Sequence, residues 1–414
     1  MTNVSLIKDV ELFLDDKPSV FALRNEAKQA FLNAKIPSKK NETWKYSNVK
    51  EILENDFEIL ANVANEKCEC GCCSHHSDEN FLNIVFCKGR LHIEEYNLPK
   101  GVNVISLAEV LYDGEYKKYI HKTYDLEKNF FASLNGVYLE QGICFVVDEK
   151  IKEPIIIRYR NDDANNLMMN VHNLFLLNKN SKIEVVEEFL SSNDNKYFMN
   201  VVNEFLIKEG ASFNHYKVQK ESFNAYHIAL NSIKIEKNAE YKQYYLSNGA
   251  KISRNETLVN LDNDDARAEV FSMYKAKKGC LTDITTNVNH NVSNTHSNQY
   301  AKAVLEEDSG AVFQGKVYIA KDAVKSEGNQ LHKALYLGDA ELNCKPELEI
   351  YADDVKCSHG ASSGEVDKEQ LFYLTSRGIA KEDAFNMLIN AHLEEIVSIV
   401  PNEDIRYKFF SSIL

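Results

Sequence analysis

The chain has 414 residues and a formal net charge of −14 at pH 7. This length predicts two or three domains, and 44% apolar with 27% charged residues is typical of a globular protein with a sizeable core. The acidic balance argues against nucleic-acid binding, because phosphate recognition needs a basic surface. The chain has neither a Lys/Arg cluster for anionic lipid nor a run of about 18 apolar residues for a membrane span.

The first 16 residues have no basic start and no continuous apolar stretch, so they do not resemble a signal peptide. We therefore expect a cytoplasmic protein whose nine cysteines are reduced. In that compartment an unusual cysteine is better explained by metal binding or catalysis than by a disulfide.

Apolar residues at helical spacing predict two amphipathic helices within residues 4–35, and Pro37 ends this pattern. Trp44 is the only tryptophan, and we expect it to be a packing anchor rather than a ligand.

Residues 66–80 form an unusual segment rich in cysteine and histidine. The spacing matches no standard zinc-finger or ferredoxin pattern, and composition alone favours a polar loop that binds metal only adventitiously. A site for zinc, copper(I) or iron is the alternative. Its candidate ligands are Cys68, Cys70, Cys72, Cys73, His75 and His76.

From about residue 137 the chain changes to short runs rich in Val, Ile, Phe and Tyr, separated by Asn, Asp and Gly, which predict strands and turns. A small residue recurs after a polar turn, with separations of 30, 28, 27, 45 and 29 residues. A period near 28 favours a β-helix of stacked coils over a β-sandwich, and we attribute the 45-residue gap to an insertion or irregular turn. These small residues are Ser181, Ala211, Ala239, Ala266, Ala311 and Ala340.

Alternation of apolar and polar residues predicts a half-buried strand over residues 347–352. If the extended path continues, Asp353, Cys357 and His359 share one face, because residues two apart point the same way. A thiolate and an imidazole suit iron, zinc or copper, although a lone Cys-x-His pair is more often a packed cysteine beside a surface histidine. We expect Gly360 and Gly364 to break the strand.

The C-terminal part is predicted to be helical. Asp367 and Gln370 resemble a capping box at a helix start, and Gly378 is placed as a C-terminal cap. A second apolar stripe runs from Ala384 to Ile396, and Pro401 ends it.

Several motifs of this chain resemble the SufD branch of the SufB/SufD family of iron–sulfur cluster assembly scaffold proteins. The strings are Y-A-D-D-V-K-C-S-H-G-A at 351–361, L-F-Y-L-T-S-R-G-I at 371–379, A-V-F-Q-G-K-V-Y-I-A at 311–320, K-S-E-G-N-Q at 325–330 and, more loosely, E-T-W-K-Y-S at 42–47. The SufB branch typically has H-E-A-T where this chain has H-G-A-S at 359–362.

The resemblance implies a mainly β fold, with a right-handed parallel β-helix core between helical segments. We place an N-terminal helical and mixed region at 1–125, the core at 126–362 and a C-terminal helical segment at 363–414. The implied partners are SufB-like and SufC-like (ABC-type ATPase) subunits, and a homodimer of the chain alone is left open.

In that complex, Cys357 and His359 are the candidate ligands of a transient iron–sulfur cluster at the interface, with no cofactor tightly bound to the isolated chain. The sequence contains no P-loop, no Rossmann fingerprint and no nucleophile elbow, so we do not expect an enzyme. Two alternatives stay open. One is a SufB-like subunit with the primary cluster, and the other is a cytosolic carbohydrate-active β-helix enzyme that uses clustered aspartates such as Asp262, Asp264 and Asp265.

Overall fold

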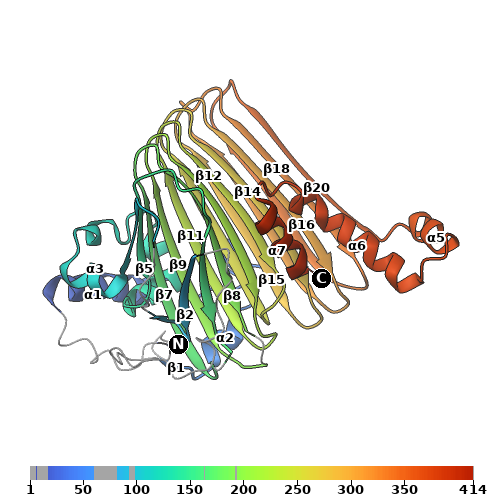
Figure 1. Cartoon of the computed structure of the whole chain (residues 1–414), viewed down its shortest axis with the longest axis horizontal. Helices are drawn as coiled ribbons and strands as arrows, with labels where there is room; N and C mark the ends of the chain where they lie inside the picture. The colour runs from blue at the N-terminus through green and yellow to red at the C-terminus, as the bar shows by residue number, and fades with distance from the viewer. Residues whose placement is uncertain are drawn as a thin grey trace.

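The computed structural model describes residues 6, 17–59, 82–92, 98–162, 164–191 and 194–413. Its centre is a stack of coils in which the chain passes alternately through two facing sheets (Figure 1). Helices flank this stack at both ends of the chain. The predicted mainly β fold, a β-helix between helical segments, is confirmed.

From β5 onward, odd-numbered strands form sheet A and even-numbered strands form sheet B, and all these pairs are parallel. At the N-terminal end β3 belongs to sheet B and β4 to sheet A, and among the described strands only the pairs β2–β3 and β4–β5 are antiparallel. In pairing order, sheet A contains β19 (Glu341–Ile350), β17 (Gly310–Ile319), β15 (Leu281–His290), β13 (Ile252–Leu261), β11 (Tyr226–Ile235), β9 (Phe198–Ile207), β7 (Leu167–Leu177), β5 (Ile143–Val147) and β4 (Val102–Ser106), with β1 (Glu58–Ile59) on β7. Sheet B contains β20 (Lys356–Glu365), β18 (Glu327–Tyr336), β16 (His296–Leu305), β14 (Arg267–Ala276), β12 (Glu240–Ser247), β10 (Ser212–Lys220), β8 (Lys182–Leu190), β6 (Ile155–Arg160), β2 (Leu82–Cys87) and β3 (Arg90–His92).

The strand register confirms the predicted period. Ser212 of β10 pairs with Lys182 on one side and with Glu240 on the other, which lie 30 and 28 residues away in the sequence. The attribution of the 45-residue gap to an insertion is wrong. Ala266 precedes β14 in sheet B, whereas Ala311 lies in β17 of sheet A. The 45-residue separation therefore compares a position in one sheet with a position in the other.

The turns between strands explain the recurring Asn and Asp residues. Asn180, Asn238 and Asp265 have φ angles of 61°, 56° and 58°, in the left-handed region that these two residue types tolerate best after glycine. Asp262, in the same turn as Asp265, accepts a hydrogen bond from Asn291 of the next coil at 2.7 Å. The aspartate cluster therefore has an ordinary turn role.

The interior between the sheets is largely apolar and aromatic. Rings of the same register stack from coil to coil, as in Tyr159–Phe189, with centroids 4.3 Å apart, and Phe175–Phe205, at 4.7 Å. Each coil thus buries its inward side chains on the next, which is the stabilising principle of a solenoid.

An N-terminal cover, defined here as residues 17–57 and 107–138, packs on the outer face of sheet A. Trp44 is buried there, with its ring 4.0 Å from the Arg254 guanidinium carbon and 5.5 Å from the Phe131 ring, so its expected anchoring role is confirmed. The second predicted N-terminal helix is confirmed, and the first, apart from Leu6, lies outside the described residues. The cover contains α1 (Pro18–Asn33), η3 (Glu42–Trp44), α2 (Lys50–Glu54), α3 (Leu107–Asp113), η5 (Glu115–Tyr119), η6 (Leu126–Lys128) and α4 (Phe130–Val137).

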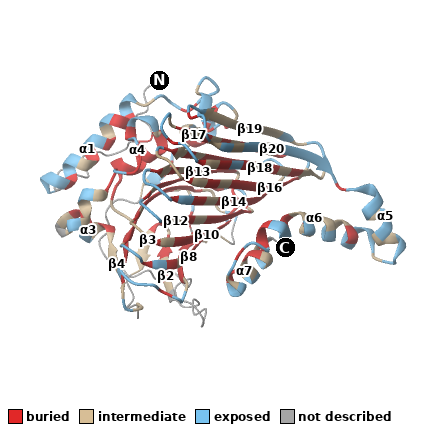
Figure 2. Ribbon diagram, turned by 90° about the horizontal axis from the view of Figure 1, so that it is seen from above, coloured by how far each residue is buried: buried red, intermediate tan, exposed pale blue. Residues whose placement is uncertain are grey.

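Three helices follow the last strand: α5 (Lys368–Ser376), α6 (Lys381–Val397) and α7 (Glu403–Ile413). α6 and α7 pack on the outer face of sheet B, while α5 projects away from the body (Figure 2). Asp367 caps α5 as predicted, and Gly378 follows its end with a φ of 90°. None of the described helices is long and apolar enough to cross a membrane.

Candidate functional site

The last coil of the stack is open. Within the described chain, β19 pairs only with β17, and β20 pairs only with β18. Every residue of these two strands is half-buried or exposed, unlike the strands behind them. Both sheets therefore end in an unpaired strand edge, which is the geometry that accepts a strand from another chain.

Cys357 and His359 lie in β20 and share one face, because they are two residues apart in a strand. Cys357 is half-buried against the apolar cluster around Val317 and Ile319, and burial raises the pKa of its thiol above the ordinary value. His359 is exposed. The two side chains thus face the interior of the solenoid at the point where no further coil covers it.

Two local predictions about this segment are wrong. The extended path does not continue from Glu347 to His359, because β19 ends at Ile350 and the chain crosses through residues 351–355 to the opposite sheet. Asp353 is therefore in the corner and not on the strand. The glycines do not break the strand either, since β20 continues through Gly360 and Gly364 in full register with β18.

The open coil brings too few ligands together to close a metal site. No group of three or more His, Cys, Asp or Glu side chains among the described residues could hold a metal ion. The segment from Cys68 to His76 lies outside the described residues. Cys357 and His359 can supply two ligands, and any further ligand must come from elsewhere.

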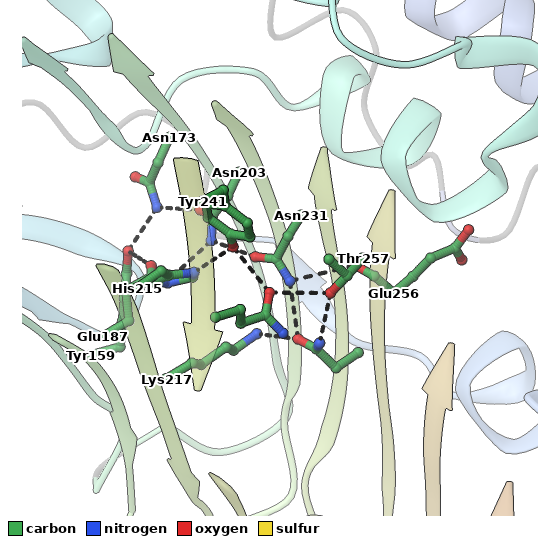
Figure 3. Close-up of polar contacts among 12 residues, drawn as sticks. Tyr159, Asn173, Glu187, Asn203, His215, Lys217, Asn231, Tyr241, Glu256 and Thr257 are labelled. Carbon is green, nitrogen blue, oxygen red and sulfur yellow. Dashed lines mark hydrogen bonds and ion pairs between the residues drawn. The ribbon is translucent and has the colours of Figure 1, made fainter. Parts of the chain in front are cut away.

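A network of buried polar side chains, which the sequence analysis missed, crosses the solenoid interior (Figure 3). Glu187 lies at its centre. Its carboxylate accepts hydrogen bonds from Tyr159 at 3.1 Å and Asn203 at 2.8 Å, and its Oε2 lies 2.7 Å from Nε2 of His215. All four side chains have no exposed surface.

The network extends along the stack through asparagines of successive strands. Asn173 donates to Asn203 at 2.9 Å, Asn203 to Asn231 at 3.0 Å, and Asn231 to Asn255 at 3.1 Å. Lys217 donates to Asn255 at 2.9 Å, and burial lowers the pKa of this lysine to about 8. Because this network has no surface exposure, we assign it to fixing the coil register rather than to substrate chemistry.

A sequence signal for the network exists in β10. Phe213, His215, Lys217 and Gln219 alternate along F-N-H-Y-K-V-Q-K, so three polar residues are in phase with a buried phenylalanine. Polar residues at apolar positions of a strand indicate a buried, mutually satisfied set.

The C-terminal helices divide into a packed part and a projecting part. α6 packs through Ile389, Leu393 and Ile396 on the outer face of sheet B. α5 has no buried residue, and its Phe372 and Tyr373 are 73% and 56% exposed. Large exposed aromatic side chains on a projecting helix indicate a surface for protein contacts.

Comparison with known proteins connects this architecture to a family. The model of the SufBD core domain of the SUF system for iron–sulfur cluster assembly matches residues 159–392. The chain belongs to the SufBD family. The model of the SufBD N-terminal region matches residues 6–157, which include the described parts of the cover.

Relatives in this family agree with the assignment. The iron–sulfur cluster assembly protein SufD of Escherichia coli is 33% identical over 204 residues, covering 49% of this chain and 48% of the relative. The chloroplastic protein ABCI7 of Arabidopsis thaliana is 28% identical over 411 residues, covering 93% and 83%. The SufBD family protein slr0076 of Synechocystis is 33% identical over 194 residues, covering 47% and 43%. The chain thus spans about half the length of two of these SufBD relatives and most of the third.

Proposed function

We propose that this chain is a SufD-like scaffold subunit that acts with a SufB-like subunit and a SufC-like ABC-type ATPase to assemble iron–sulfur clusters. The observation that carries the proposal is the SufBD core match over residues 159–392, which includes the open last coil. A relative named SufD at 33% identity favours a SufD-like over a SufB-like role.

The open last coil supports a contact with the SufB-like subunit. Its unpaired edges offer backbone donors and acceptors, and its inward face presents Cys357 and His359 at the rim. The cluster is cargo in this proposal. Two ligands from this chain and the remainder from the partner would hold it at the interface, so it can be released when the interface moves.

The projecting α5 supports a contact with the ATPase. α6 is fixed on sheet B through its apolar stripe, so α5 is presented at a defined place beyond the body (Figure 2). Phe372 and Tyr373 provide exposed aromatic surface for a partner.

We also propose that the chain has no catalytic activity of its own. Its sequence contains no P-loop for nucleotide phosphates. The clustered aspartates that a carbohydrate-active enzyme would need have the turn role described above. Neither feature favours the enzyme alternative.

Copurification tests this function. The tagged chain, expressed with its SufB-like and SufC-like subunits, should purify as one complex, and ATP hydrolysis should depend on the SufC-like subunit. Failure to recover either subunit, or ATP turnover that persists in the repurified chain alone, would contradict the scaffold role.

A further inference from the structure

A buried carboxylate of sheet A binds the backbone of the N-terminal cover. The Glu204 carboxylate of β9 accepts hydrogen bonds from the backbone N–H groups of His121, Lys122 and Thr123 at 2.6, 2.9 and 3.0 Å. It also lies 3.0 Å from Nε2 of His172 in β7. Burial raises the pKa of Glu204, but the hydrogen bond and charge of His172 outweigh it, so the net pKa falls below the ordinary value.

Both ring nitrogens of His172 lie beside hydrogen-bond acceptors. The Asn135 amide donates to two backbone carbonyls, those of Val171 and Asn200, each at 3.0 Å. Its Oδ1 therefore faces Nδ1 of His172, at 3.1 Å, and can only accept. Because the Glu204 carboxylate also accepts, both ring nitrogens of His172 face acceptors.

His121 occupies an unfavourable place beside this pair. Its side chain is 7% exposed, and neither ring nitrogen has a hydrogen-bond partner among the residues that the structure describes. Its ring lies 5.5 Å from the His172 ring, and its backbone has a left-handed φ of 59°. A Cβ added at Gly136 of α4 would lie 3.0 Å from Nε2 of His121, so α4 packs closely against this side of the ring.

The surroundings of His121 oppose a second positive charge. The groups that act on it are His172 and Glu204 from sheet A and Lys122 of its own segment. Tyr124 contacts its ring edge. Burial, followed by the charge of His172, lowers the pKa of His121 to about 3, although Glu204 acts in the opposite direction.

We propose that His121 is a protonation-controlled switch, and that charging its ring separates the N-terminal cover from the outer face of sheet A. Separation would give the imidazolium access to water and would uncover the apolar outer surface around Val202, Ile228 and Leu230. The inference does not depend on the proposed function.

Linkage gives the size of the effect. A histidine with an ordinary pKa of 6.5 when released and about 3 when buried takes up a proton on separation throughout the window between those values. His121 alone should therefore raise the equilibrium constant for separation about 30-fold from pH 7.5 to pH 5.0. The ordinary pKa of Glu204, 4.5, lies below this range, and comparison with a variant that lacks the His121 imidazole isolates its contribution.

Hydrogen exchange on the full chain tests the switch, with rates corrected for the intrinsic pH dependence of exchange. Wild-type peptides from α1 and α4 should show the about 30-fold rise in opening, while peptides from β14 and β16 should not. His121→Asn tolerates a left-handed backbone and does not titrate, so it should abolish the rise. His296→Asn, at the half-exposed histidine that begins β16, is the matched control and should retain it.

Two results would overturn the proposal. One is an opening constant of the wild-type cover that does not change between pH 7.5 and 5.0, a measurement that needs no variant. The other is an equal rise in His121→Asn. If that variant does not fold, His121→Gln provides the same comparison.

Discussion

At the residue scale, His359 is the side chain on which the proposed chemistry depends most. It is exposed at the rim of the open coil, whereas its neighbour Cys357 is half-buried and has a raised thiol pKa. An exposed imidazole is accessible to iron and can bind it through a ring nitrogen. The half-buried thiol needs a metal or a partner to become a thiolate.

We predict that His359→Ala folds normally but fails in cluster assembly. Surface substitutions usually change the free energy of unfolding by less than about 0.5 kcal/mol. The activity of an iron–sulfur enzyme, in cells that lack the native protein, should fall by at least the roughly 10–100-fold that loss of an outer-shell partner costs a metal site. His296→Ala, at a half-exposed histidine in β16, should support full activity. Full activity of His359→Ala would contradict a ligand role and would leave His359 as an ordinary surface histidine.

Lys217 provides a second test at this scale, because its pKa is about 8 in the folded chain and 10.5 ordinarily. At pH values between these two pKa values, Lys217 takes up a proton when the chain unfolds. The free energy of unfolding therefore increases as the pH rises through this range. From pH 7.5 to 9.5 the wild type should gain about 2 kcal/mol over Lys217→Met in denaturant unfolding. An equal pH dependence in both proteins would contradict burial of this charge, and Lys368→Met is the exposed control.

The same residues show what the sequence could predict. Cys357 and His359 were found from their spacing and from family motifs, and their common strand face was correct. Their exposure was not predictable, because it depends on the absence of a following coil rather than on local pattern. Lys217 and Glu187 were missed, because a charged residue is ordinarily assigned to the surface and only its strand phase indicates burial.

At the element scale, the repeat period was predictable from the sequence. Which sheet each turn belongs to was not predictable. The small residues mark turns of both sheets. Only the strand pairing shows that Ala266 and Ala311 belong to different sheets. The corner at residues 351–355 was missed for a related reason. It contains neither glycine nor proline, so the alternation of the preceding strand gave no sign of the change of sheet.

The division between α5 and α6 leads to a prediction about ATPase binding. Phe372→Asp should weaken binding of the SufC-like subunit by about 30-fold, the equivalent of about 2 kcal/mol for a central aromatic contact. It should not alter folding, because Phe372 contacts solvent over most of its surface. Tyr407→Asp on α7 is a matched control, since Tyr407 is 74% exposed on the packed part. Calorimetric titration that gives equal affinities for Phe372→Asp and the control would place the contact elsewhere.

At the scale of the whole molecule, the two regions that we propose as partner contacts lie near the C-terminal end of the solenoid. The last coil is unpaired, and α5 projects from the same end of the chain (Figure 1). At the N-terminal end, among the described residues, the sheets end at β3 and β4, which pair antiparallel with β2 and β5. We propose that the chain contacts its partners through the C-terminal end of the stack.

The most direct test measures iron and sulfide bound to the reconstituted complex. The SufB-like and SufC-like subunits, supplied with iron, a sulfide source and ATP, should accumulate stoichiometric iron and acid-labile sulfide when the wild-type chain is present. They should accumulate little when it is omitted or replaced by His359→Ala. Equal cluster content in all three preparations would contradict the claim that this chain is a cluster-assembly scaffold.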